Sequence, residues 1–158
     1  MNTDTPTTLP TPDFAAWDAK QKAFDASARD LLAQNKTALF DALQKAGITA
    51  VIVHFDGYGD SGQIEDIEAR QGDESRELPT DTIEVLSPVW DSSEIERQTC
   101  AITDAIETMA YDFLSQTHAG WENNDGAYGD FTFDVAARAI SLDYNERYTA
   151  SENYTHDF

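Results

Sequence analysis

The sequence predicts an α+β domain in which helices pack on one face of a four-stranded, mostly antiparallel sheet. Apolar residues recur at helical spacing over 13–46 and again over 93–119, which indicates helices. The β-branched run ITAVIV at 48–53 leads into a glycine-rich turn, and two alternating stretches follow at 131–137 and 139–148. These patterns predict two hairpins in the order α-α-ββ-α-ββ, with the helices layered on the sheet.

The composition is that of one folded domain. The chain has 158 residues, 41% of them hydrophobic, which suffices for a core without cross-links. Cys100 is the only cysteine, so an intramolecular disulfide and a cysteine zinc site are both excluded. No run approaches the roughly 20 apolar residues of a membrane span, and the N-terminus lacks the basic and apolar regions of a secretory signal. We expect a cytoplasmic protein with a flexible arm at 1–12 and one domain at 13–158.

The net charge is the strongest compositional signal. Asp and Glu number 30 against 10 Lys and Arg, which gives −20. Such a surface repels nucleic acid and anionic membranes, and it attracts basic protein surfaces and cations. The acidity has three ordinary explanations: solubility alone, adaptation to high salt, or imitation of the phosphates of a nucleic acid.

The N-terminal third predicts two helices. Asp13 can cap the first, whose apolar positions form an aromatic stripe of the kind found in cores: Phe14, Trp17, Phe24, Ala28, Leu31 and Leu32. Asn35 is expected to interrupt this helix and cap a second one, which carries Leu39 and Leu43. Gly47 follows as a C-terminal cap.

The stretch HFDGYGDSGQIEDIE, residues 54–68, predicts the turn and second arm of a hairpin. Gly57, Gly59 and Gly62 are expected to allow positive φ and a sharp reversal. Ile64 and Ile67 have odd spacing, so a regular strand cannot point both to one face. We therefore expect a β-bulge near Glu65 and Asp66, or coverage of the two isoleucines by different elements.

The segment after this hairpin predicts a polar loop, a short extended piece and the third helix. The loop is GDESRELPTDT and the extended piece is EVLSPVW. Ser93 to Glu96 reads as a capping box that opens the helix, and Gly120 ends it. Its apolar face would be Ile95, Ile102, Ala105, Ile106, Met109, Phe113 and Leu114.

The second hairpin alternates in both arms. Phe131, Phe133 and Val135 share one face of the first arm, and Ile140, Leu142 and Tyr144 share one face of the second. The opposite face of the sheet would then be polar and acidic, either solvated or a binding surface. Its members would be Thr132, Asp134, Ser141, Asp143 and Asn145.

Several chemical motifs fail in this chain. The glycine-rich turn lacks the alternating ligands and final Glu of an EF-hand, and it lacks the lysine of a phosphate-binding loop. GDSG around Ser61 matches the serine context of trypsin-like proteases by coincidence, because the chain is too short for their two barrels. His54, His118 and His156 are far apart in sequence, without metal-ligand spacing. Carboxylates on one sheet face could act as acid and base, but the sequence does not show that any two converge, so no catalytic residue is assigned.

Two blocks carry a resemblance to a known family. They are AGITAVIVHFDGYGDSGQIED at 46–66 and DGAYGDFTFDVAARAISLDYNERY at 125–148, with ENYTHDF at the C-terminus as a weaker third. In these blocks the chain resembles a family of uncharacterised small acidic proteins of proteobacteria, often encoded on plasmids and other mobile elements. The resemblance implies no established activity. It favours roles that such elements need, including the blocking of host defence nucleases.

The favoured hypothesis is a non-enzymatic binding protein that mimics nucleic acid and occupies a basic, nucleic-acid-binding partner. It would contact neither nucleic acid nor membrane directly. The expected contacts are Asp56, Asp60, Glu65, Asp66, Glu68, Asp134 and Asp143. A second hypothesis is a metal-dependent enzyme or metal-regulated module that holds a divalent cation through Asp56, Asp60 and Glu65. A third is a salt-adapted, soluble domain whose protein partner binds by shape. No cofactor other than such a cation is expected.

Overall fold

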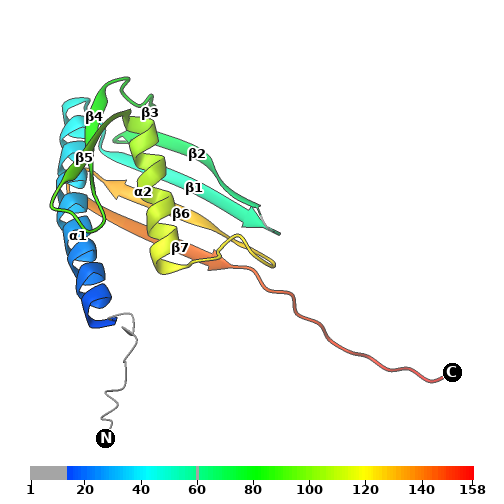
Figure 1. Ribbon diagram of the computed structural model, residues 1–158. Helices are drawn as coiled ribbons and strands as arrows, with labels where there is room; N and C mark the ends of the chain where they lie inside the picture. The colour runs from blue at the N-terminus through cyan, green and yellow to red at the C-terminus, as the bar shows by residue number, and fades with distance from the viewer. Residues whose placement is uncertain (1–13, 60) are drawn as a thin grey trace, which may run out of the picture.

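A computed structural model describes residues 14–59 and 61–158, and the arm expected at 1–12 lies outside them. Two helices and a β-hairpin lie on one side of an antiparallel sheet (Figure 1). The elements in order are α1 (Phe14–Lys45), β1 (Ala50–Tyr58), β2 (Ser61–Gln71), β3 (Glu74–Arg76), β4 (Thr82–Pro88), β5 (Ile95–Ala101), α2 (Ile102–Thr117), β6 (Ala127–Asp134) and β7 (Ala139–Glu146). The α+β class and both expected hairpins are confirmed.

The main sheet has five strands rather than four, in the order β3-β2-β1-β6-β7. The additional strand is β3, which lies in the expected polar loop and pairs with the end of β2 through only three residues. β4 and β5 form a separate two-stranded sheet that packs against α1 and also contacts α2. Neither described helix combines the length and apolar character needed to cross a bilayer.

The first two expected helices are one continuous helix, α1. Asn35 does not interrupt it, because its side chain is buried against β4 and bonds to the backbone of Leu86 instead of capping a helix. The expected aromatic stripe is only partly a core face. Phe14 and Trp17 are exposed, whereas Phe24 contacts Trp90, which lies just after β4, with ring centroids 5.3 Å apart. The helix is firmly buried only from Leu31 onward.

Gly47 caps the C-terminal end of α1, as the sequence predicts. This glycine has φ +78°, and its N–H donates to the carbonyl of Gln44. The Ile48 N–H donates to the carbonyl of Leu43, and both side chains enter the core. This pair of hydrogen bonds is the Schellman motif, which turns the chain sharply from α1 into β1.

The expected capping box at Ser93–Glu96 is wrong, because the segment from Ile95 pairs with β4 as a strand. α2 begins at Ile102, and its N-cap residue Ala101 makes no side-chain capping bond. Ser92, rather than Ser93, accepts a backbone hydrogen bond, from the Glu94 N–H in the hairpin loop. The expected apolar face is correct from Ile102 onward, whereas Ile95 is exposed.

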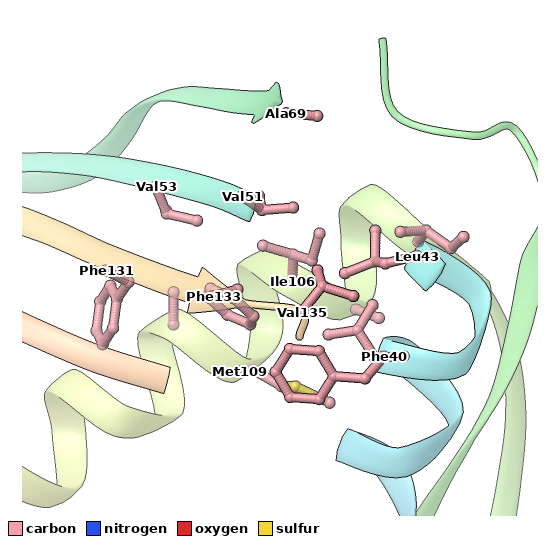
Figure 2. Packing of buried hydrophobic residues seen from close by; sticks show 14 of the residues in the cluster. Phe40, Leu43, Val51, Val53, Ala69, Ile106, Met109, Phe131, Phe133 and Val135 are labelled. Atoms are coloured by element: carbon pink, nitrogen blue, oxygen red, sulfur yellow. The ribbon is translucent and has the colours of Figure 1, made fainter. Parts of the chain in front are cut away.

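The core lies between the sheet and the helices. Phe40 and Leu43 of α1 and Ile106 and Met109 of α2 surround Phe133 of β6 (Figure 2). Val51, Val53 and Phe55 of β1 and Phe131 of β6 continue this layer along the sheet. β1 alternates buried and partly exposed positions along most of its length, so its other side chains point away from the helices.

Candidate functional site

The sheet face away from the helices, termed the open face below, is strongly acidic. The strand registers place on it the side chains that alternate with the core residues of β1, β6 and β7, together with their partners on β2. The registers place Asp56, Asp66, Glu68, Asp130, Asp134 and Asp143 there. Glu65 has no strand partner, but it joins them because its carboxylate accepts from Gln63, which is paired with Asp56. All of the expected partner-binding residues except Asp60, which lies outside the described residues, therefore share one surface.

A row of ionisable side chains crosses the middle of the open face. His54 on β1 is paired with Asp66 on β2 and with Asp130 on β6, and Asp130 is paired in turn with Asp143 on β7. His54 Nδ1 and Asp130 Oδ1 form a hydrogen bond between partly exposed side chains. Asp66 and Asp143 have no hydrogen bond or ion pair with any described side chain, so their charges remain available to a partner.

Asp56 lies two residues after His54 on β1, and it forms an ion pair with Arg147. Its Oδ1 atom lies 2.8 Å from Nη1 of Arg147, although the geometry is not that of a hydrogen bond, and this oxygen has no contact with solvent. Arg147 also donates to the carbonyl of Gly57 and lies 4.5 Å from the ring centroid of Tyr128. Asp56 is therefore engaged within the domain and is less available than Asp66 or Asp143.

The remaining acidic residues occupy the edges of the open face. Glu68 accepts from Arg70 at 3.1 Å, and Asp134 accepts from the Ala137 N–H at the β6–β7 turn. Glu65 accepts from Gln63, whose strand partner is Asp56. Among the described residues, no three His, Cys, Asp or Glu side chains are arranged to hold a metal ion. The proposed metal trio includes Asp60, outside those residues, so the trio itself is not tested.

The β-bulge expected in β2 is present. His54 pairs with Asp66 and Phe55 pairs with Ile64, which leaves Glu65 as the extra residue. The insertion lets Ile64 and Ile67 both pack against the core despite their odd spacing. It thereby returns Asp66 and Glu68 to the open face, so the bulge sets the charge pattern there.

The three glycines of the β1–β2 hairpin serve two different purposes. Gly59 has φ +65°, as the two-residue turn between Tyr58 and Ser61 requires. The positive φ expected for Gly57 and Gly62 is absent. A Cβ atom on either one would lie 2.6–2.7 Å from Cζ3 of Trp121, so these glycines make room for the indole.

A concave region lies on the opposite side of the molecule, between α1, β4 and α2. It is a groove of about 640 Å³ whose apolar lining includes Leu32, Val85 and Phe113. Asp104 and Asp112 of α2 also line it. Burial raises the pKa of the Asp112 carboxyl, and burial followed by the charge of Asp104 raises the pKa of the Cys100 thiol.

Asp112→Asn is expected to stabilise the protein slightly at neutral pH. A carboxyl whose pKa is raised on folding binds its proton more tightly in the folded state, so stability falls as pH rises through the interval above its ordinary value of 3.8. Because the carboxyl is only partly buried and solvent screens its exposed part, the gain should be only a few tenths of a kcal/mol. Thermal melts at pH 7 and near pH 4 should show the gain shrinking on acidification. Asp104→Asn removes the same charge from the same helix and serves as the control; an equal gain would contradict the assignment to Asp112.

Comparison with models of protein families gives one match. A family model described as a family of unknown function, DUF6878, matches residues 31–158. The chain belongs to this family. The match begins where α1 becomes buried, includes the whole open face and both quoted sequence blocks, and extends through the C-terminal segment. Comparison with curated proteins and with solved structures gives no match.

Sequence reasoning missed three residues that organise this surface. Asp130 has the same strand parity as Thr132 and Asp134, but the strand was expected to begin only at Phe131. Trp121 lies in a segment without periodicity, and Arg147 lies near the end of the alternating stretch 139–148. Only the tertiary structure brings Arg147 to Asp56 and Trp121 to the hairpin glycines. The alternation of β6 was the one usable signal. Continued from Thr132 back by two residues, it places Asp130 on the same face of the sheet.

Proposed function

We propose that this protein is a non-enzymatic binding protein whose open face occupies the basic, nucleic-acid-binding surface of another protein. The observation that carries the proposal is the spread of carboxylates over one sheet face that no described helix or strand covers, where Arg70 and Arg147 are already engaged by Glu68 and Asp56. A nuclease or a repressor, whose binding site is built to attract phosphates, is the kind of partner that suits such a face.

The spacing of a β-sheet supports collective action of these charges. Neighbouring strands lie about 4.8 Å apart, and alternate residues along a strand lie about 6.7 Å apart. Cross-strand and alternate-position carboxylates are therefore closer together than the Debye length of about 8 Å at physiological salt. A partner then meets a continuous negative surface, and the antiparallel framework limits the reorganisation needed to present it.

A competition experiment tests the proposal. Fluorescently labelled duplex DNA is bound to a panel of basic nucleases and repressors, and its release by this protein is followed by anisotropy across a salt series. We expect at least one member to lose its DNA, with competition that weakens steeply as salt rises because the contacts are electrostatic. Failure to release DNA from any member, or release that is independent of salt, would contradict mimicry.

Asp66→Asn combined with Asp143→Asn should weaken this competition by roughly three- to tenfold, since an exposed ion pair contributes about 0.2–1 kcal/mol. Neither carboxylate has a described partner within the domain, so the melting temperature should not fall. The matched control is Glu94→Gln with Glu96→Gln, which removes the same two charges at the β4–β5 hairpin. Equal weakening by both pairs would indicate that net charge alone, rather than the open face, drives binding.

A further inference from the structure

The C-terminal tail, residues 147–158, leaves the domain as an extended segment that points away from the body (Figure 1). It continues the direction of β7, because the Arg147 N–H donates to the carbonyl of Gly126 beside the first residue of β6. Beyond Thr149, which bonds to Asp125, its hydrogen bonds and ring contacts remain within the tail. Tyr148 and Tyr154 are 83% and 73% exposed, which is unusual for aromatic side chains in a globular domain.

The tail has the residue pattern of a β-strand with one buried face. Its aromatic side chains occupy even positions, which are Tyr148, Tyr154, His156 and Phe158, together with Ala150 and one charged residue, Glu152. The odd positions are all polar: Thr149, Ser151, Asn153, Thr155 and Asp157. Contacts within the tail agree with this alternation, since Tyr154 bonds to Glu152 and the ring of His156 approaches that of Phe158. Period-two alternation of this kind predicts a strand. Among the described residues of one chain, no strand pairs with it.

The tail and β7 both have their larger apolar side chains at even-numbered positions. Ile140, Leu142 and Tyr144 pack against the core, and all three occupy even positions. If β7 continued through the tail, the aromatic side chains would therefore fall on the core side of the sheet. Tyr144 already stacks there on His118, with centroids 3.6 Å apart, so an aromatic surface is present beside the β7 edge.

The outer edge of β7 is available for pairing. β7 ends the strand order of the sheet, and no described strand bonds to its outer side. The edge contains none of the proline or lysine residues that commonly protect sheet edges. The tail after Glu146 has enough residues to cover seven of the eight residues of β7, from Ile140 to Glu146, and to pass around a two-fold axis between two chains.

We propose that two copies of this chain exchange their tails, each tail adding as an antiparallel strand to the β7 edge of the other copy. The arrangement is self-complementary, as two-fold symmetry requires, because each copy supplies one tail and receives one. In the register centred on Thr149, Tyr154 faces Tyr144 and Phe158 faces Ile140. Every even residue then meets an even residue: Tyr154, His156 and Phe158 lie beside the partly buried apolar side chains of β7. Glu152 faces Glu146 in this register, and this like-charge pair opposes the dimer most strongly at low salt.

This inference uses the edge and the tail, so it stands independently of a basic partner on the open face. The family match also runs to Phe158, so the tail belongs to the sequence that the family shares. Repulsion between two chains of charge −20 opposes association. Dimerisation should therefore strengthen with salt, the opposite of the dependence expected for binding a basic partner.

Sedimentation equilibrium of the full chain in 1 M NaCl, where the Debye length is about 3 Å, tests the proposal. We expect twice the monomer mass of 17.5 kDa at concentrations up to the hundred-micromolar range. Truncation after Ala150 keeps the Thr149–Asp125 bond and should give a monomer with unchanged far-UV circular dichroism. Tyr154→Ser with Phe158→Ser should also give a monomer, whereas Asn153→Ser with Thr155→Ser, on the other side of the strand, should leave the dimer intact.

Hydrogen exchange on the same samples locates the interface. In the full chain, slow exchange is expected both at 139–146 and at 151–158, and truncation should restore fast exchange at the β7 edge. A monomeric full chain at every salt concentration would overturn the proposal. So would a dimer that survives truncation, or one whose tail amides exchange at the rate of an unstructured peptide.

Discussion

Gly126→Ala is expected to lower the free energy of unfolding by roughly 3 kcal/mol or more. Gly126 has φ +79°, a conformation that an alanine adopts only at a cost. A Cβ atom there would also overlap the carbonyl oxygen of Gly57, and backbone cannot rotate away as a side chain can. The loop before β6 would have to separate from the β1–β2 hairpin, which would also displace Asp56 from Arg147.

The matched control is Gly59→Ala. Gly59 also has positive φ, but nothing lies within 4 Å of the position its Cβ would take. Its cost should be about 1 kcal/mol, the contribution of backbone conformation alone. Urea denaturation followed by tryptophan fluorescence measures both variants. Equal losses would contradict the close approach of Gly126 to the hairpin.

Residue parity explains why much of the sheet could be predicted from sequence. Phe131 and Phe133 alternate with polar residues, so the core side of β6 followed directly from the period of a strand. The conflict between Ile64 and Ile67 predicted either a bulge in β2 or coverage of the two side chains by different elements, and the structure has the bulge. Gly47 was likewise predictable, since a left-handed residue ends many helices.

Elements that depend on distant partners were not predictable in this way. Ile95 precedes Ile102 by seven residues, a spacing that also fits a helix, and only pairing with β4 makes the segment a strand. The short strand β3 forms where the chain turns back after Gln71 and pairs with the outer edge of β2, and its three residues are too few to show a period. Local sequence does not show which strand each of these segments will join.

In the candidate site, too, some features follow from the local sequence and others depend on distant partners. The acidic character of the open face followed from parity, but the distinction between engaged and available carboxylates did not. Asp56 is engaged because Arg147, 91 positions later in the chain, folds across the end of β1. Asp66 is available because its strand partner is His54, which bonds to Asp130 on its other side. If the open face binds a basic partner as proposed, the carboxylates that the fold leaves unpaired are the ones expected to contact it.

Asn35→Ala is the other change with a large expected effect, a loss of about 2–4 kcal/mol in the free energy of unfolding. The Asn35 amide accepts from the Leu86 N–H at 2.8 Å and donates to the Leu86 carbonyl at 2.9 Å. The side-chain amide thus makes the two hydrogen bonds to Leu86 that a neighbouring strand would make, on the edge of β4 opposite β5. Alanine would leave both backbone groups of Leu86 without their partner and would open a small space in the interface between α1 and the hairpin.

Gln34→Ala is the control for this change, because Gln34 is exposed on the same helix and its replacement should alter stability by no more than about 0.5 kcal/mol. Hydrogen exchange adds a local measurement, since the Leu86 amide should lose protection in Asn35→Ala before β1 and β6 do. A variant of Asn35 as stable as Gln34→Ala would show that water replaces the amide at no cost. The buried asparagine would then be a consequence of how α1 packs on β4, and not what joins the two.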